Sequence, residues 1–383
     1  MTRVAVKPEL LRWAMQRAEL DVESLSGRFP KLEAWEIGEV SPTLNQLESF
    51  ARVTHVPVGF LFLDAPPHES MPIPDFRLMG GIRPGHPSPD LLDTIYACQQ
   101  RQEWYHDYAR QHGEKPLSFI GAATVDDDVI QVASNIRRAI GFDLQERRAM
   151  PTWQDAMRRF IQQVETIGVL VMISGIVGGN TRRKLDPEEF RGFTLVDELA
   201  PLIFINGADT RAAQMFTLAH ELAHVWLGQS GVSDVQAATI ITDKKNERWC
   251  NAVAAEILAP IDRVRELYQA DVEFQEELHR LARMFKISTL VILRRLFDAG
   301  FIDRETLRGF YRQEMSRLRK KDRTSGGGGS FYHTLGARVS KRFARAVVGS
   351  TLEGNTLFRD AFRMLGIKKT ETFHRAAREF GGY

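Results

Sequence analysis

Residues 220–224 read His-Glu-Leu-Ala-His, and this motif constrains the fold and the chemistry of the chain more than any other segment. Positions four apart on an α-helix lie on one face about one turn apart, so His220 and His224 can bind one metal ion together. Glu221 is then placed to accept a proton from a water molecule at that metal. Two imidazoles and one further hard ligand suit zinc and leave its fourth position to water. The motif predicts a helical zinc site with a general base; the alternative is a core helix with two hydrogen-bonded histidines.

The flanking residues predict that this helix is buried below a small sheet. The helix is otherwise mainly apolar, and Gly228 follows it where a C-terminal cap is expected. Two apolar, β-rich runs precede it, at residues 192–196 and 202–205. A helix of this kind lies below a twisted sheet whose edge strand can hold an extended peptide by backbone hydrogen bonds. We therefore expect an α+β chain that is mostly helical.

A third metal ligand is expected from a second helix, within residues 246–260. Successive residues advance by about 100° around a helix. Glu256 comes nine residues after Glu247 and therefore points to the opposite face, where we expect it to be solvated. Asn251 shares the face of Glu247, so we expect Glu247 to be the third ligand and Asn251 to orient a ligand histidine. Cys250 lies on a neighbouring part of that face, which leaves a sulfur ligand open.

These two motifs together resemble the ImmA/IrrE family of zinc metallopeptidases. The resemblance covers about residues 165–300 and rests on Phe-Thr-Leu-Ala-His-Glu-Leu-Ala-His at residues 216–224 and on Glu-Arg-Trp-Cys-Asn, then Ala-Ala-Glu-Ile-Leu-Ala-Pro, within residues 247–260. It implies a zincin-like core with Glu221 as general base and acid. The zinc ligands that it implies are His220, His224 and Glu247. Family members are proteolytic regulators that cut a partner protein, often a repressor, in response to stress or mobile-element signals.

This chain departs from the family pattern at three positions of the second helix. They are Cys250, Val253 and Ala259, where the pattern has alanine, phenylalanine and methionine. A packed helix tolerates all three changes. The donor that stabilises the oxyanion during peptide hydrolysis stays open, because spacing does not decide between Tyr268 and His279.

Residues 10–63 resemble an Xre-type helix-turn-helix domain. The resemblance includes Trp-Glu-Ile-Gly at the end of the recognition helix and Pro-Thr at the start of the next helix. The stretch from Leu25 to Trp35 is about four residues shorter than the pattern, and the loss falls where bases are contacted. Residues 1–66 also carry a net charge of −2. We therefore expect the fold, with a degenerate recognition helix, but not DNA reading by residues 28–36.

The overall charge of +2 conceals a basic C-terminal third, because residues 276–383 carry +12. This asymmetry indicates an acidic partner, either nucleic acid or protein, or else ordinary solvated helix faces. Residues 281–296 have the spacing of a second helix-turn-helix, with Ser288 capping a helix that would present Arg294 and Arg295. The alternative, which we favour, is a helical subdomain that supports the zinc site.

Proline and glycine positions predict how the chain is organised. Residues 66–91 are rich in both and indicate a connector, followed by helices at residues 91–110 and 125–140. Residues 338–365 are basic and amphipathic, with an apolar stripe that is more typical of a core than of a partner groove. The expected segments are a helix-turn-helix domain (1–66), a connector with helices (67–150), the peptidase core (151–275), a helix-turn-helix-like subdomain (276–324), and a glycine linker with a basic helical domain (325–383).

The rest of the sequence favours a regulator in the cytoplasm. No secretory leader and no run of 18 apolar residues is found, and two cysteines are too few for a disulfide framework. We expect a zinc-dependent regulatory metalloendopeptidase that cleaves a specific partner, a repressor or a toxin, in a bacterial stress, mobile-element or toxin–antitoxin circuit. The alternative is a DNA-binding repressor or antitoxin paired with a PIN-type ribonuclease toxin, in which the zinc site is not proteolytic. DNA binding through residues 281–296 or the N-terminal domain, and oligomerisation, stay open; no membrane partner is expected.

Overall fold

The chain folds into two compact units, which are described separately below. The computed structural model describes residues 3–76, 87–233, 245–322 and 331–381. The units are residues 1–72 with 84–93, and residues 73–83 with 94–383. The described residues are mostly helical with one small sheet, which confirms the predicted α+β class.

Two of the predicted segments fall wholly or partly outside this description. The glycine linker at residues 325–330 lies outside the described residues, as do residues 77–86 of the connector. Within the described ranges, no helix combines the length and the apolar content that a membrane crossing requires.

The N-terminal unit is a small helical domain around a core that includes Phe29, Trp35 and Phe50. Its elements are α1 (Pro8–Arg17), α2 (Val22–Ser26), α3 (Leu32–Glu36), α4 (Leu44–Val53) and the 3₁₀ helix η1 (Val58–Phe62). Thr43 caps α4 in a capping box with Gln46, so this helix does begin after the Pro-Thr pair. Within residues 28–36, where we expected a degenerate recognition helix, only the five residues of α3 are helical, and Leu32 and Trp35 among them are buried. Little of this helix is therefore left to contact a partner.

The second unit is built around a four-stranded mixed sheet with the order β1-β3-β2-β4. The strands are β1 (Leu170–Ser174), β2 (Gly192–Leu195), β3 (Leu202–Asn206) and β4 (Gly231–Ser233). β1 runs parallel to β3, whereas β2 pairs antiparallel with both β3 and β4. The first three strands are almost wholly buried, because helices cover both faces of the sheet. The two predicted apolar runs are β2 and β3.

The helix with the motif, α9 (Arg211–Leu227), packs against β2 and β3. α10 (Lys245–Leu258) packs on α9, α6 (Val129–Ile140) packs on α10, and α8 (Trp153–Thr166) packs on α9 and β1. One hydrophobic core continues from these helices into the following helical pairs. The remaining helices on this side are α7 (Leu144–Ala149), α11 (Ile261–Leu267), α12 (Phe274–Phe285), α13 (Thr289–Asp298) and α14 (Arg304–Asp322).

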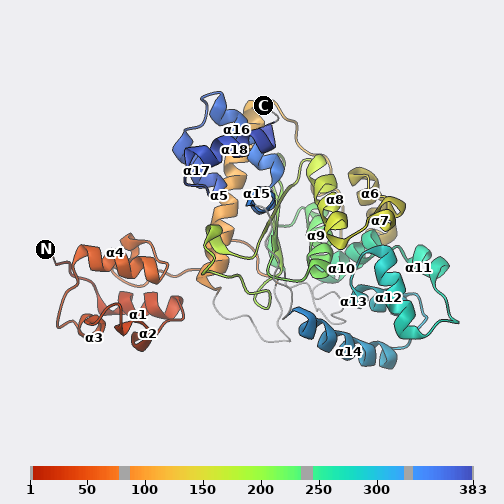
Figure 1. The fold of residues 1–383 in the computed structure, drawn as a ribbon, viewed down its shortest axis with the longest axis horizontal. Helices are drawn as coiled ribbons and strands as arrows, with labels where there is room; N and C mark the ends of the chain where they lie inside the picture. The colour runs from red at the N-terminus through yellow and green to blue at the C-terminus, as the bar shows by residue number, and fades with distance from the viewer. Residues whose placement is uncertain (1–2, 77–86, 234–244, 323–330, 382–383) are drawn as a thin grey trace. The chain divides into compact units, whose positions relative to one another are not determined.

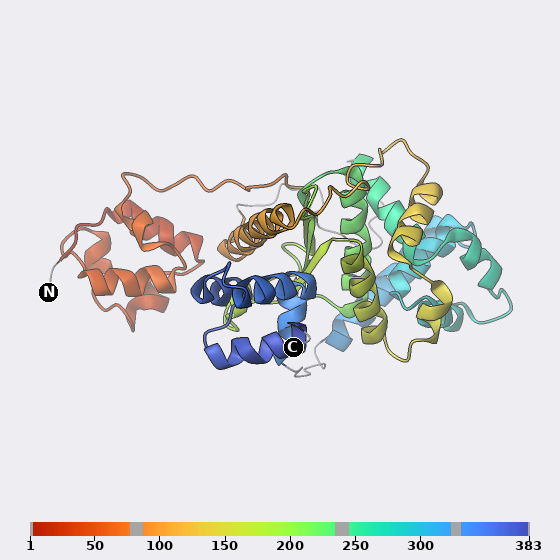
Figure 2. The same cartoon turned by 90° about the horizontal axis from the view of Figure 1, so that it is seen from above.

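The C-terminal helices and α5 (Pro89–Gln111) lie on the other side of the sheet from α8 and α9 (Figure 1), and the view from above agrees (Figure 2). The helix α15 contacts β1, and Gln102 of α5 donates to the carbonyls of Leu195 and Ala200. The elements of this C-terminal part are α15 (Phe331–Val339), α16 (Lys341–Leu352), α17 (Phe358–Leu365) and α18 (Thr370–Gly381). A short 3₁₀ helix, η2 (Val177–Gly179), follows β1.

Two sequence predictions need correction here. The helix expected at residues 125–140 begins at Val129, because Asp128 caps its first turn. The apolar stripe expected over residues 338–365 is not continuous, because the chain leaves α16 after Leu352 and turns before α17. Its first part, with Phe343, is buried, whereas Leu357 is 64% exposed.

Candidate metal centre

The motif helix α9 is buried around its whole circumference. Thr210 caps its start by accepting from the amide of Ala213, and Gly228 ends it in the left-handed conformation, as predicted. A side chain at Gly228 would lie 3.0 Å from the Cα of Gly121, so the helix end also packs closely against a loop. Polar groups buried on such a helix need partners, because an unpaired buried group is costly.

His220, His224 and Glu247 come together in the structure, and we call them the histidine–glutamate cluster. One ligand atom from each lies within 4.8 Å of the others, and all three residues are buried. The two Nε2 atoms are 3.0 Å apart. Glu247 of α10 places one oxygen 3.3 Å from Nε2 of His220 and the other 3.1 Å from Nε2 of His224. The helical phases of α9 and α10 thus converge on one point.

The cluster suits a cation better than internal hydrogen bonds. Nδ1 of His220 lies 3.1 Å from the amide oxygen of Asn251, an acceptor, so Nδ1 carries the proton in a neutral ring and Nε2 presents a lone pair. That lone pair faces the second imidazole and a carboxylate. Glu247 Oε1 is buried and makes no hydrogen bond of good geometry within the described chain. Two imidazoles and a carboxylate that converge in this way fit zinc.

The charges of the cluster are consistent with ligand chemistry. Burial opposes ionisation of Glu247, but the neighbouring His220 and His224 outweigh burial and hold its pKa well below the usual value. By contrast, burial raises the pKa of the Cys250 thiol well above its usual value, and the charges of Glu247 and Glu221 add to the effect. A thiol must lose its proton to bind a metal. The structure therefore favours Glu247 over Cys250 as the third ligand.

Glu221 lies beside the cluster, and its two carboxylate oxygens differ: one accepts a hydrogen bond, and the other, which we call the open oxygen, is buried without one from the described residues. Thr194 of β2 donates to Oε2 at 2.7 Å, whereas Oε1 is buried without a hydrogen bond from the described residues. Burial raises the pKa of Glu221 to about 7, against lowering contributions from His224 and Thr194. The Ser233 hydroxyl of β4 also lowers this pKa, although it makes no hydrogen bond of good geometry in the described part of the chain. A carboxylate of this kind is suited to accept and return a proton near neutral pH.

Gly192 of β2 gives Glu221 the room that it needs. A Cβ at this position would lie 2.7 Å from Thr217 Cγ2 and 3.0 Å from Glu221 Oε1. The sequence analysis placed Gly192 and Thr194 in a β-rich run but assigned neither of them to the site. A signal for Thr194 was present, because it is a hydroxyl residue in an apolar run that was expected to lie over the motif helix.

Residues 164–297 match the family model described as the IrrE N-terminal-like domain, a peptidase family. This match spans the sheet, α9, α10 and the helices that support them. It supports the resemblance to ImmA/IrrE proteins and a metallopeptidase-type activity. Residues 339–379 match a domain of unknown function, and no curated protein matches the chain.

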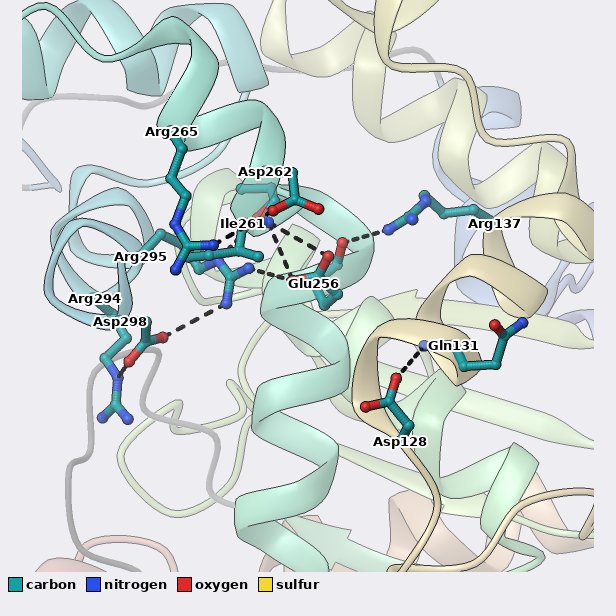
Figure 3. A network of polar contacts seen from close by, with 11 residues as sticks. Asp128, Gln131, Arg137, Glu256, Ile261, Asp262, Arg265, Arg294, Arg295 and Asp298 are labelled. Atoms are coloured by element: carbon teal, nitrogen blue, oxygen red, sulfur yellow. Dashed lines mark hydrogen bonds and ion pairs between the residues drawn. The ribbon is translucent and has the colours of Figure 1, made fainter. Parts of the chain in front are cut away.

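Within this peptidase-like region, the prediction for Glu256 is wrong. Glu256 is 3% exposed and not solvated. Its carboxylate accepts from Arg295 of α13 and from the amide of Ile261, while Arg137 of α6 donates to its carbonyl at 2.6 Å (Figure 3). Helical phase correctly placed Glu256 away from the cluster, but a second layer of helices covers that face.

The same contact bears on the alternative interpretation of residues 281–296, in which the second helix presents Arg294 and Arg295. Arg295 is 6% exposed and donates to Glu256 and to the carbonyl of Ala259, so α13 does not present it to a partner. Arg294 pairs with Asp298 on the outer side of the helix. α13 therefore contacts the C-terminal end of α10 through Arg295, and α12 packs on α13.

The oxyanion donor stays open. Tyr268 stacks on Phe301, with ring centroids 4.1 Å apart. Nδ1 of His279 lies 2.7 Å from the Gln275 carbonyl, and the other ring nitrogen lies 3.9 Å from Glu314. These contacts lie within α12, with α14 and with the loop after α13, and none of them involves the histidine–glutamate cluster.

We expect Asn251→Ala to weaken zinc binding by about 10–100-fold, which is the usual cost of losing a group that orients a ligand histidine. Without the amide oxygen, His220 loses the acceptor that fixes its tautomer. Competition of the purified chain against a zinc-binding dye measures the change. Asn135→Ala, the same substitution at an exposed position of α6, serves as the control and should leave the affinity unchanged. Equal affinity of the Asn251→Ala and unaltered chains would contradict the assignment.

Proposed function

We propose that this chain is a regulatory zinc metalloendopeptidase that cleaves a specific partner protein, a repressor or a toxin-type protein, in a bacterial stress, mobile-element or toxin–antitoxin circuit. The observation that carries the proposal is the open carboxylate oxygen of Glu221 beside the histidine–glutamate cluster. A purely structural metal site has no use for a buried carboxylate with an open oxygen, because that oxygen carries a desolvation cost. The match of residues 164–297 to a peptidase family supports the same conclusion.

His220, His224 and Glu247 would hold the zinc. Bound there, zinc would supply Lewis-acid chemistry, acidifying water and polarising the scissile carbonyl. Glu221 accepts the proton of the attacking water at its open oxygen, and Thr194 holds the other oxygen so that the carboxylate keeps its orientation. Glu221 then returns the proton to the leaving amine. Asn251 fixes the tautomer of His220.

A narrow choice of substrate follows from the surroundings of the cluster. The three ligand residues and Glu221 are all buried, so only a segment that enters in an extended form reaches them. Such a segment can pair its backbone with an edge strand, and β4 is the edge strand that neighbours β2, the strand in contact with Glu221. In a folded partner protein, only an exposed loop or terminus can adopt this extended form and enter the site.

A trapping experiment in cells tests the proposal. Glu221→Gln keeps the size of the side chain and the zinc ligands, but its amide does not accept the proton. We expect the tagged variant to retain an intact partner protein, and the unaltered chain to produce two fragments of that protein. Mass spectrometry of both samples identifies the partner and the cleaved bond.

The alternative function predicts a different result. A repressor or antitoxin would hold the same toxin or DNA in both forms, intact and with equal biological effect. That outcome would overturn the proposed peptidase function. The short α3, with two of its five residues buried, gives the DNA-binding alternative little support.

A further inference from the structure

A segment of the connector occupies the outer edge of β4. The amide of Phe76 donates to the carbonyl of Val232 at 2.9 Å, and the amide of Val232 donates to the carbonyl of Pro74 at 2.9 Å. Asp75 pairs with Val232 in a parallel bridge. The other edge of β4 pairs with β2, so residues 74–76 extend the sheet by one short strand. We call residues 74–76 the connector segment.

The side chain of Phe76 seats against the histidine–glutamate cluster. Its ring is nearly parallel to the imidazole of His224, with centroids 5.7 Å apart and planes 7° apart. Gly231 of β4 leaves the space for this ring, because a Cβ there would lie 2.2 Å from a ring carbon. We call this space, between Gly231 and His224, the ring slot. A planar side chain fits it, since one wall is a flat imidazole and the other is bare backbone.

The position of β4 relates the connector segment to the chemistry of the site. Ser233 of β4 pairs with Gly192 of β2, which lies against Glu221, and Phe76 contacts a cluster histidine directly. Any peptide paired with the outer edge of β4 therefore runs past the cluster. In recognition by strand addition, backbone hydrogen bonds provide affinity and side-chain pockets provide specificity. Here the edge of β4 offers the backbone hydrogen bonds, and the ring slot offers the side-chain pocket.

We propose that the outer edge of β4 and the ring slot form the docking surface for an extended substrate segment with an aromatic side chain, and that the connector segment occupies this surface as an internal ligand. That the docked segment is a substrate rests on the proposed peptidase function, whereas the docking of an extended segment does not. The contacts that hold the connector segment include two backbone hydrogen bonds and one ring contact. A tethered ligand acts at an effective concentration on the order of millimolar, so a substrate at a lower concentration displaces it only by binding the surface more tightly than the connector segment does.

Peptide binding to the full chain tests the inference. The probe is a fluorescein-labelled peptide amide with the sequence Met-Pro-Ile-Pro-Asp-Phe, which is that of residues 71–76. Phe76→Ala removes the ring from the internal ligand but leaves the slot intact. We expect this variant to bind the probe at least about 10-fold more tightly than the unaltered chain by fluorescence anisotropy. Phe62→Ala, which removes an exposed ring from the N-terminal unit, should bind like the unaltered chain.

Three further measurements exclude non-specific binding and misfolding as explanations. A probe with alanine in place of phenylalanine should not bind to Phe76→Ala. Adding Gly231→Ala to this variant fills the slot with a methyl group, so binding of the original probe should be lost. Hydrogen exchange at the amides of residues 76 and 232 should be faster in Phe76→Ala, which shows release of the connector segment in a chain that is otherwise folded.

The outcomes separate this inference from the proposed function. Equal probe affinity of Phe76→Ala and the unaltered chain, or no binding to either, overturns the inference even if a partner protein is cleaved. Tighter binding to Phe76→Ala supports the docking surface even if no cleavage is found, because the measurement needs no turnover. In that case the trapping experiment alone would reject the peptidase.

Discussion

Replacing Glu221 with glutamine is expected to slow peptide-bond cleavage by about 10²–10⁴-fold, the usual contribution of a general base. The amide retains an oxygen that accepts from Thr194, so the side chain keeps its place. It has no basic site for the proton of the attacking water. The reaction then depends on bulk solvent, which the buried site admits poorly. The ratio of kcat/KM values, measured on the partner identified by trapping, gives the size of the effect.

Two controls make this result specific. Zinc content of the Glu221→Gln protein should match that of the unaltered chain, because Glu221 is outside the histidine–glutamate cluster. Glu188→Gln, at an exposed position of the same unit, should leave kcat/KM unchanged. A loss smaller than threefold in Glu221→Gln, with zinc intact, would remove Glu221 from the chemistry.

The centre of the site could be predicted from sequence because its geometry is local. Helical phase alone places His220 and His224 on one face of α9, and it separates Glu247 from Glu256 on α10. The sequence did not show that the two helices contact each other, and the structure shows that they do. The resemblance to a known family pointed to the same residues.

The parts that could not be predicted depend on contacts between distant segments. Helical phase predicts the face of α10 on which Glu256 lies but not the residues that cover this face. Arg295, which covers it, is 39 residues away in the sequence. Phe76 belongs to a proline-rich connector, where no periodicity indicates a strand. Its partner β4 has three residues, too few for a strand to be recognised by pattern.

Breaking the contact between Glu256 and Arg295 is expected to cost about 3–5 kcal/mol of unfolding free energy, since it leaves one buried charge without its partner. Glu256→Leu removes the carboxylate that accepts from both Arg295 and the Ile261 amide. Arg295→Met leaves the carboxylate with that amide. Urea unfolding of each variant, followed by circular dichroism, measures the change.

The double variant decides what the ion pair contributes. Apolar replacement of both partners of a buried pair is often neutral or even stabilising, by about 1–4 kcal/mol. We therefore expect Glu256→Leu with Arg295→Met to be far more stable than the sum of the single losses predicts. Arg294→Met, which breaks the more exposed pair with Asp298, should cost about 0–1 kcal/mol. If Glu256→Leu and Arg295→Met each lost no more unfolding free energy than Arg294→Met, the contact between Glu256 and Arg295 would not stabilise the packing of α13 on α10. Zinc content should persist in all of these variants while they are folded, because this pair lies on the face of α10 opposite to Glu247.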